Sequence, residues 1–180
     1  NQKSYNKKHG EYWIYGINPV IAALKNKSRE CKRLLCTKET SSKFNNIIIE
    51  LAKNRGISIE KVSRKEISNH LEPESRHQGI ILRVETLPES KINISLDSLS
   101  KNPILIALDQ ISDPQNIGAI IRSSVVFGCE GIIIPKKNSP NETGLLAKSA
   151  SGALEIANIH RVTNLSRTLK NLKKNGFWVI

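Results

Sequence analysis

The sequence contains no methionine, only 4% aromatic residues, and no apolar run close to the roughly 18 residues that span a bilayer. From the missing methionine we expect that the first residue of the translation product is not part of the chain. Because aromatic rings are scarce, we do not expect single-stranded nucleic acid to bind by base stacking. The N-terminal residues are polar and basic and do not resemble a signal peptide, so we expect a cytoplasmic protein without a membrane partner.

Metal sites and disulfide frameworks are also not expected. The three cysteines, Cys31, Cys36 and Cys129, are odd in number and show no CxxC spacing, which argues against structural zinc and paired disulfides. The four histidines form no HExxH motif. No glycine-rich phosphate loop follows an apolar segment, which argues against a Rossmann-type nucleotide site.

Positive charge is abundant and unevenly distributed. The 180 residues carry a formal net charge of +12, which favours phosphate-rich partners. Residues 1–85 contain 17 Lys and Arg against 9 Glu and no Asp, whereas residues 86–180 contain 11 Lys and Arg against 7 acidic residues. This asymmetry predicts two domains, and the first is the one we expect to meet a polyanion.

Periodicity divides the chain into four parts. Residues 1–11 are expected to form a disordered basic arm, 12–85 a small α/β domain, 86–102 a linker and 103–180 a second α/β domain. In the first domain, Asn18 is expected to cap a helix with Pro19 as its first residue. The other expected elements there are strands at 13–16, 33–36, 57–62 and 79–84 and helices at 43–54 and 64–71.

Strands and helices alternate in the second domain, which predicts a mostly parallel sheet. The strand at 104–108 is continuously apolar and is expected to be buried on both faces, as is the strand at 131–134. Further strands are expected at 156–162 and from residue 177, with helices at 117–127, 142–149 and 165–174. Because the sequence stops inside an apolar run, we expect a truncated chain.

The loop after the strand at 104–108 contains the most informative residues. Ligand sites in open α/β sheets lie at the carboxyl ends of the strands. Pro114 stiffens the turn, and Asn116 is expected to cap the following helix. Gly118 lets another backbone or a substrate approach closely, and Arg122 lies four residues beyond it on the same helix face. Asn116 and Arg122 are thus expected to converge on a phosphate at the helix N-terminus.

The same residues have a purely structural interpretation. Asn116 can be a helix cap and nothing more, Gly118 a packing contact, and Arg122 a solvated surface charge. The residue types and spacing alone leave both interpretations open.

The pattern D-P-x-N-x-G-x-x-x-R resembles the first signature motif of the SpoU (TrmH-type) RNA 2′-O-ribose methyltransferases of the SPOUT superfamily; its residues are Asp113, Pro114, Asn116, Gly118 and Arg122. Residues 15–20, 77–79, 148–155 and 162–165 extend the resemblance to about residues 12–180. It points to the subgroup that methylates a guanosine ribose in 23S ribosomal RNA. The implied fold is a small L30e-like α/β RNA-binding domain followed by a SPOUT α/β-knot methyltransferase domain.

The resemblance implies a reaction and an assembly. A methyl group would pass from S-adenosyl-L-methionine to a ribose 2′-hydroxyl, with Asn116 and Arg122 as catalytic residues and Asp113, Pro114 and Gly118 supporting the loop. Arg122 would hold the target phosphate and help to activate the hydroxyl. The family pattern is a homodimer in which Arg122 of one subunit meets the cofactor of the other.

The N-terminal domain would contact the ribosomal RNA, and our candidates for that contact are Lys32, Arg64, Arg76 and His77. A solvated basic face without a defined partner is the other interpretation of these four residues.

Two signature motifs of the family, a GSEG-type loop and an S-L-N-V-type segment, do not occur in the sequence. We therefore expect the cofactor-binding residues and the knot to lie beyond Ile180, and this chain alone to be inactive. If the natural chain ends at Ile180, the alternative is a non-catalytic RNA-binding module. The coding sequence after Ile180 separates the two hypotheses.

Overall fold

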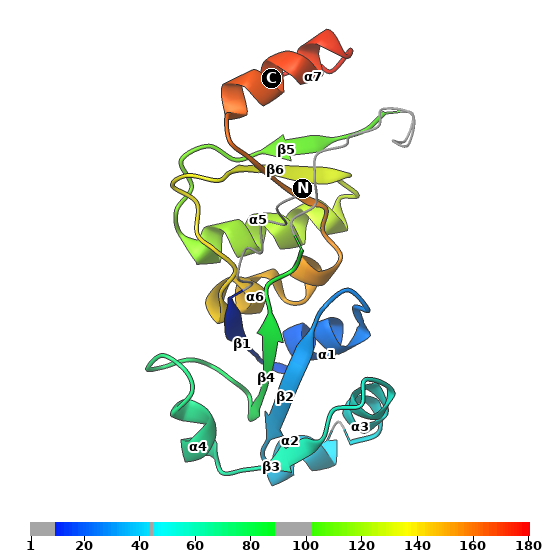
Figure 1. Ribbon diagram of the computed structural model, residues 1–180, viewed down its shortest axis with the longest axis vertical. Helices are drawn as coiled ribbons and strands as arrows, with labels where there is room; N and C mark the ends of the chain where they lie inside the picture. The colour runs from blue at the N-terminus through cyan, green and yellow to red at the C-terminus, as the bar shows by residue number, and fades with distance from the viewer. Residues whose placement is uncertain (1–9, 44, 89–101) are drawn as a thin grey trace, which may run out of the picture. The chain divides into compact units, whose positions relative to one another are not determined.

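The computed structural model describes residues 10–43, 45–88 and 102–180, without the side chains of 41–43 and 45 (Figure 1). The chain divides into two compact units, Asn1–Leu87 and Pro88–Ile180, which are described separately. Residues 1–9 of the expected arm and 89–101 of the expected linker lie outside the described residues. Within the described residues, no helix combines the length and apolarity that a membrane crossing requires.

Unit 1 contains a mixed four-stranded sheet with strand order β1-β4-β2-β3. The strands are β1 (Glu11–Tyr15), β2 (Cys31–Cys36), β3 (Ile59–Lys61) and β4 (Ile80–Glu85). Strand β4 runs antiparallel to β1 and β2, whereas β2 and β3 are parallel. The helices are α1 (Ile17–Lys25), α2 (Lys38–Lys43), α3 (Asn45–Asn54) and α4 (Arg64–Ser68). This is the small α/β domain that the sequence predicts.

Alternation along the strands gives this sheet two buried faces. Tyr15, Leu35 and Ile81 point to one face, where they pack against Ile67 of α4. The neighbouring residues Ile14, Leu34 and Leu82 point to the other face and are fully buried. Helices α1 and α3 contact each other, and Figure 1 shows them across the sheet from α4.

Three details of unit 1 differ from the sequence predictions. Strand β1 begins at Glu11, so the final residue of the expected arm belongs to the sheet. Gly16 rather than Asn18 caps α1, because its φ of 92° lets the chain turn directly from β1 into the helix. Helix α2 was not expected, since it contains no apolar residue. Thr40 fixes it by donating from Oγ1 to the carbonyl of Gln78 at 2.9 Å.

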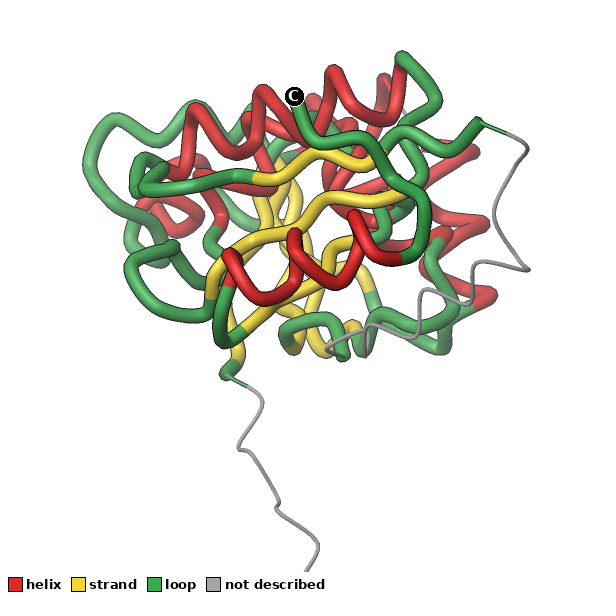
Figure 2. Tube along the Cα trace, turned by 90° about the horizontal axis from the view of Figure 1, so that it is seen from above, coloured by secondary structure: helices red, strands yellow, loops and turns green. Residues whose placement is uncertain are grey.

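Unit 2 contains a parallel three-stranded sheet with order β5-β6-β7, which confirms the mostly parallel sheet. The strands are β5 (Leu105–Ala107), β6 (Gly131–Pro135) and β7 (Ile159–Val162). Helix α7 (Leu165–Lys174) lies across one face (Figure 2), where Leu172 packs on Ile133 and Val162. Helices α5 (Pro114–Val126) and α6 (Gly144–Ala150) pack on each other, and a 3-10 turn, Ala153–Glu155, follows α6.

Two predictions for the strands of unit 2 are wrong. Strand β5 is not buried on both faces: Leu105 and Ile106 are half-buried and Ala107 is exposed, because β5 lies at the edge of this sheet. The buried strand is the central one, β6. Residues 177–180 form no strand; Phe177 packs beside Leu172, whereas the Trp178 side chain is 93% exposed.

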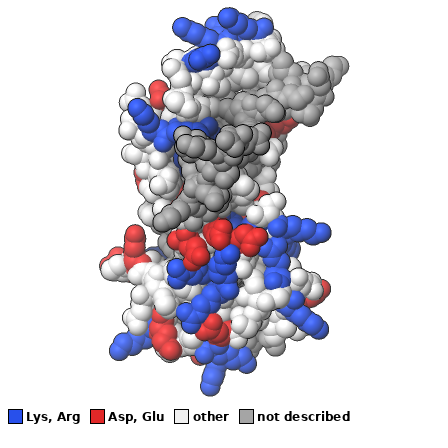
Figure 3. Space-filling model, viewed as in Figure 1, with Lys and Arg blue, Asp and Glu red and all other residues white. Residues whose placement is uncertain are grey.

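Charged side chains of both signs lie on the face of unit 1 that Figure 3 shows. Acidic and basic groups interleave over β2 and β4 of unit 1 (Figure 3). The described Lys, Arg and Glu side chains of unit 1 therefore do not form a uniformly positive surface.

Gly79 provides a test of the unit 1 fold. An alanine Cβ there would lie 2.3 Å from Thr40 Oγ1 and 2.8 Å from Thr37 Oγ1, whereas at Gly56 it would meet nothing within 4 Å. Both glycines have positive φ, so both substitutions strain the backbone by roughly 1–2 kcal/mol. We expect Gly79→Ala to lower the free energy of unfolding by about 1–3 kcal/mol more than Gly56→Ala in urea titrations. Equal losses would contradict the packing described.

Candidate active-site loop and nucleic-acid interface

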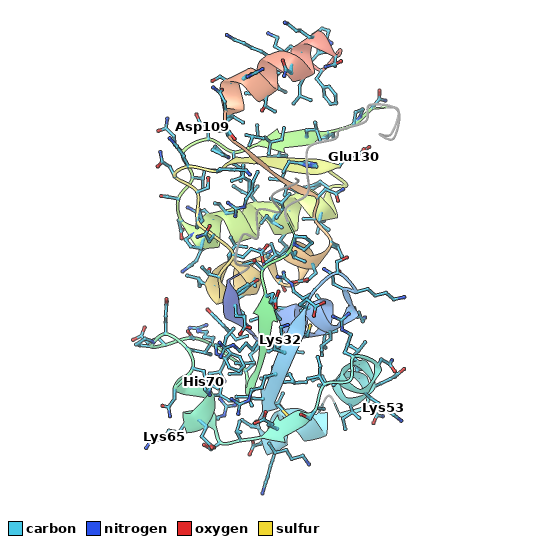
Figure 4. All side chains as sticks on the ribbon, viewed as in Figure 1. Lys32, Lys53, Lys65, His70, Asp109 and Glu130 are labelled. Carbon is cyan, nitrogen blue, oxygen red and sulfur yellow. The ribbon has the colours of Figure 1, made fainter. Side chains whose placement is uncertain are left out.

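The loop that the sequence singles out lies at the carboxyl end of β5. Asp109 follows this strand, whereas Glu130 lies at the opposite end of the sheet, before β6 (Figure 4). The loop runs from Asp109 to Asp113 and leads directly into α5. It therefore occupies the edge at which parallel sheets bind their ligands.

Asp113, and not Asn116, caps this helix. The Gln115 backbone N–H donates to Asp113 Oδ1 at 3.0 Å, and Pro114 occupies the first helical position. Proline is well suited to that position because its φ is already helical and its missing N–H would have no partner there. Asn116 lies inside the first turn with its side chain exposed. Its amide is therefore available to a partner.

Gly118 forms the contact between α5 and α6. A Cβ at this position would lie 2.6 Å from Ser149 Cβ, 2.8 Å from the Leu146 carbonyl oxygen and 2.9 Å from the Ala150 nitrogen. All three atoms belong to α6, and two of them are backbone atoms that cannot turn aside. The close approach that the sequence predicts is therefore made by another helix of the same unit.

Arg122 lies on the exposed side of α5, and among the described residues no carboxylate forms an ion pair with it. Helix geometry places it about 9 Å along the axis from Asn116 and about 120° around it. The two residues thus flank the exposed surface of α5 and do not share one face. Long side chains on helices lean toward the N-terminus, which directs Arg122 toward the loop.

The basic candidates of unit 1 differ in their surroundings. Lys32 Nζ lies 2.8 Å from Glu85 Oε1, and this hydrogen bond raises the pKa of Lys32. Arg64 begins α4 and lines a cavity of about 440 Å³ together with Lys38 and Lys61. Arg76 is exposed in the segment before β4. Of the three cations that line the cavity, the sequence pattern had indicated Arg64 alone.

His77 is buried, with 8% of its surface exposed. Its Nδ1 accepts a hydrogen bond from the Gly79 backbone N–H at 3.0 Å, so the neutral ring has its proton on Nε2, 3.4 Å from Ser68 Oγ. Burial lowers the pKa of His77, and the charge of Arg64 lowers it further. The structure therefore gives His77 a role in holding the turn before β4, in place of the RNA contact expected from the sequence.

Comparison with known proteins extends over both units. The model of the SpoU rRNA Methylase family matches residues 103–180, and the model for RNA 2′-O ribose methyltransferase substrate binding matches residues 13–90. The 23S rRNA (guanosine-2′-O-)-methyltransferase RlmB of Shewanella oneidensis is 35% identical over 170 residues, which are 93% of this chain and 68% of that protein. The chain belongs to the SpoU rRNA methylase family.

Other SpoU proteins support this membership. The RlmB protein of Pasteurella multocida is 36% identical over 172 residues, covering 93% of this chain and 69% of that protein. Among solved structures, the SpoU methyltransferase AviRb of Streptomyces viridochromogenes with AdoMet has a TM-score of 0.70 at 17% identity, over 92% of this chain and 60% of that one. The AdoMet-bound rRNA methyltransferase of Sinorhizobium meliloti has a TM-score of 0.67 at 22% identity, over 91% of this chain and 58% of that one. These structures confirm the fold, and the SpoU chain spans about 60% of the length of each.

Substitution of Gly118 distinguishes the effect of helix propensity on the free energy of unfolding from the effect of packing. Propensity alone predicts that Gly118→Ala stabilises the SpoU chain by about 1 kcal/mol. The contacts with α6 predict the opposite sign, a loss of roughly 1–3 kcal/mol in the free energy of unfolding. Ser123→Ala, at an exposed position of the same helix, is the control and should change stability by less than about 0.5 kcal/mol. Stabilisation by Gly118→Ala in urea unfolding would refute the close helix contact.

The buried His77 predicts a pH dependence. Its pKa in the folded state lies below the value of about 6.5 in the unfolded chain, so the unfolded state binds the proton first as the pH falls. The contribution of neutral His77 is complete above pH 6.5 and declines as the pH falls below it. We expect wild type to lose more stability than His77→Gln between pH 7.5 and 5.5, measured by chemical unfolding. Parallel curves would show that His77 is not the group responsible.

Proposed function

We propose that the protein transfers a methyl group from S-adenosyl-L-methionine to a ribose 2′-hydroxyl of RNA, and that the acceptor is a guanosine of 23S ribosomal RNA. The observation that carries this proposal is the position of Asn116 and Arg122. Both are exposed on α5, just after the carboxyl end of a parallel strand, inside the segment that matches the SpoU family. The named RlmB relatives support the choice of acceptor.

We assign Arg122 to the binding and activation of the acceptor, the ribose 2′-hydroxyl. A ribose hydroxyl is a weak nucleophile until its oxygen is oriented and the loss of its proton is favoured. A guanidinium remains protonated at neutral pH, so Arg122 acts by electrostatics: it holds the phosphate next to the target ribose and stabilises negative charge that develops on the 2′-oxygen. It does not accept the proton itself; the proton passes to solvent water as the methyl group bonds to the 2′-oxygen.

Asn116 is assigned to orientation of the ribose. Its exposed amide can donate to one oxygen and accept from another hydroxyl, which fits a ribose with adjacent 2′ and 3′ groups. Asp113 and Pro114 support it indirectly, because the Asp113 cap and the Pro114 ring fix where the first turn of α5 begins.

SpoU methyltransferases use S-adenosyl-L-methionine as the methyl donor, and the AviRb and Sinorhizobium meliloti structures contain it. Among the described residues around this loop, α6 fills the space beside Gly118 and Asp113 caps α5, so neither position leaves room for the cofactor. In this proposal, Arg122 and Asn116 act on the ribose that accepts the methyl group.

Lys32, Arg64 and Arg76 are proposed to contact the RNA from unit 1, the part of the chain that matches the substrate-binding model. We further propose that the protein acts as a homodimer in the cytoplasm. The chain spans about two thirds of the length of the relatives that it matches.

Replacing Arg122 tests the function. In the complete product of this gene, we expect Arg122→Ala to reduce methylation of 23S ribosomal RNA by at least about a hundredfold, because electrostatic groups at a reacting oxygen contribute factors of this order. Transfer of a labelled methyl group measures the rate, and isothermal titration with S-adenosylmethionine should show unchanged cofactor affinity.

Lys170→Ala is the matched control, since Lys170 is also exposed on a helix of unit 2. It should leave the rate unchanged. Wild-type turnover by Arg122→Ala would overturn the assignment, and methylation of a base in place of a ribose would overturn the reaction itself.

A further inference from the structure

Unit 1 contains a crevice of its own at the carboxyl ends of β2 and β3. The two strands are parallel, with Cys36 beside Lys61 at their ends. From β2 the chain continues into α2 and α3, and from β3 into α4, which packs on the opposite face of the sheet (Figure 1). Where consecutive connections depart to opposite faces, the strand ends open a ligand-binding crevice.

A cavity of about 440 Å³ occupies this position. It is lined by residues from the ends of both strands and the starts of both helices, namely Thr37, Lys38, Glu39, Lys61, Val62, Ser63, Arg64 and Glu66. Val62 is the single apolar residue in this lining. Protein-binding surfaces are centred on aromatic and aliphatic anchors, so the lining favours a polar, charged occupant.

The two carboxylates in the lining already have partners within the chain. Glu66 Oε2 accepts from the Ser63 backbone N–H and from Ser63 Oγ, each at 2.7 Å, in a capping box at the start of α4. Glu39 accepts from its own backbone N–H and from the Thr37 side chain, and these bonds lower its pKa, with smaller contributions from Arg64 and Lys38. The hydrogen bonds hold both carboxylates at helix starts.

The three cations of the lining remain available. Lys38, Lys61 and Arg64 are exposed, and none of them has an ion pair with a carboxylate of the described chain. Arg64 and Lys38 line the same cavity as Glu39, and the charges of both lower the pKa of Glu39. The groove therefore presents three cations from three different elements.

The neighbouring sheet face is different. Arg33 forms a bidentate pair with Glu60 at 2.7 Å for both bonds, and Arg83 Nε lies 2.7 Å from Glu11 Oε2. Arg33 and Arg83 are therefore each matched by a carboxylate. A polyanion would have to break these pairs in order to bind there.

We propose that the groove lined by Lys38, Lys61 and Arg64 binds backbone phosphates of the RNA substrate. This inference rests on the proposed function, and it specifies where unit 1 holds that substrate. Three cations on separate elements suit successive phosphates of a strand better than one isolated anion. Phosphate contacts of this kind release counterions, so they are measured by the salt dependence of binding.

The test compares two triple variants of the full chain. Lys38→Gln, Lys61→Gln and Arg64→Gln remove the groove cations, and Lys25→Gln, Lys27→Gln and Lys53→Gln remove three exposed cations elsewhere in unit 1. Binding to a 23S ribosomal RNA transcript is titrated at several salt concentrations. We expect the groove variant to bind about tenfold more weakly and its salt slope to fall by roughly 0.7–0.9 per lost contact. The control variant should retain the wild-type slope.

Glu39→Gln is a test in which RNA affinity should increase, and misfolding of the variant cannot produce such an increase. Removing a carboxylate from the groove should strengthen RNA binding about twofold to threefold. Unchanged binding by the groove variant, or equal losses in both triple variants, would overturn the groove as the site. If the groove variant loses RNA binding but the complete gene product transfers no methyl group, the proposed function is wrong and the groove is still supported as the RNA-binding site. If the wild-type protein methylates RNA but the groove variant binds RNA as tightly as wild type, only the proposal about the groove is wrong.

Discussion

Unit 2 depends on one close contact between two helices, at Gly118. Because Gly118 has no side chain, α5 approaches the Leu146 carbonyl and the Ala150 nitrogen of α6 directly. This contact sets the rotation of α5 about its axis, which buries Ile117 and Ile121 and leaves Asn116 and Arg122 exposed. Interiors tolerate even one added methyl group poorly, so the rotation is fixed. The presentation of both candidate catalytic side chains follows from this packing contact.

The sequence predicts strands and helices well where apolar residues recur at a clear period. The central strand β6 and helices α3, α5 and α7 were all expected, because burial imposes that period on them. Helix α2 has no apolar residue, and the hydrogen bond from Thr40 to Gln78 that fixes it joins residues far apart in the chain. Burial of β5 was overestimated for a related reason. An edge strand and a central strand can have the same apolar sequence, and only the pairing distinguishes them.

The candidate site could be predicted in part. The D-P-x-N-x-G-x-x-x-R spacing identified the loop and the helix, but asparagine suggested a cap at position 116 when Asp113 and Pro114 together form a better one. His77 carried no signal of burial in its sequence, since its partners are a backbone N–H and Ser68. The groove cations were missed for a different reason. Their availability depends on where the glutamates pair, and those pairs are formed across strands or at helix starts.

The exposed cations of the groove also affect how the protein selects one ribose among the many in an RNA. Every nucleotide of RNA has the same 2′-hydroxyl, so Arg122 and Asn116 cannot by themselves distinguish a target. Phosphate contacts carry no base information either. With 4% aromatic residues, the chain has few rings for stacking on bases. Under the proposed function, selection therefore rests on the spacing of phosphates in a folded RNA. Structured RNA is recognised by its shape, and cations held on separate rigid elements can measure that shape where a diffuse positive surface cannot.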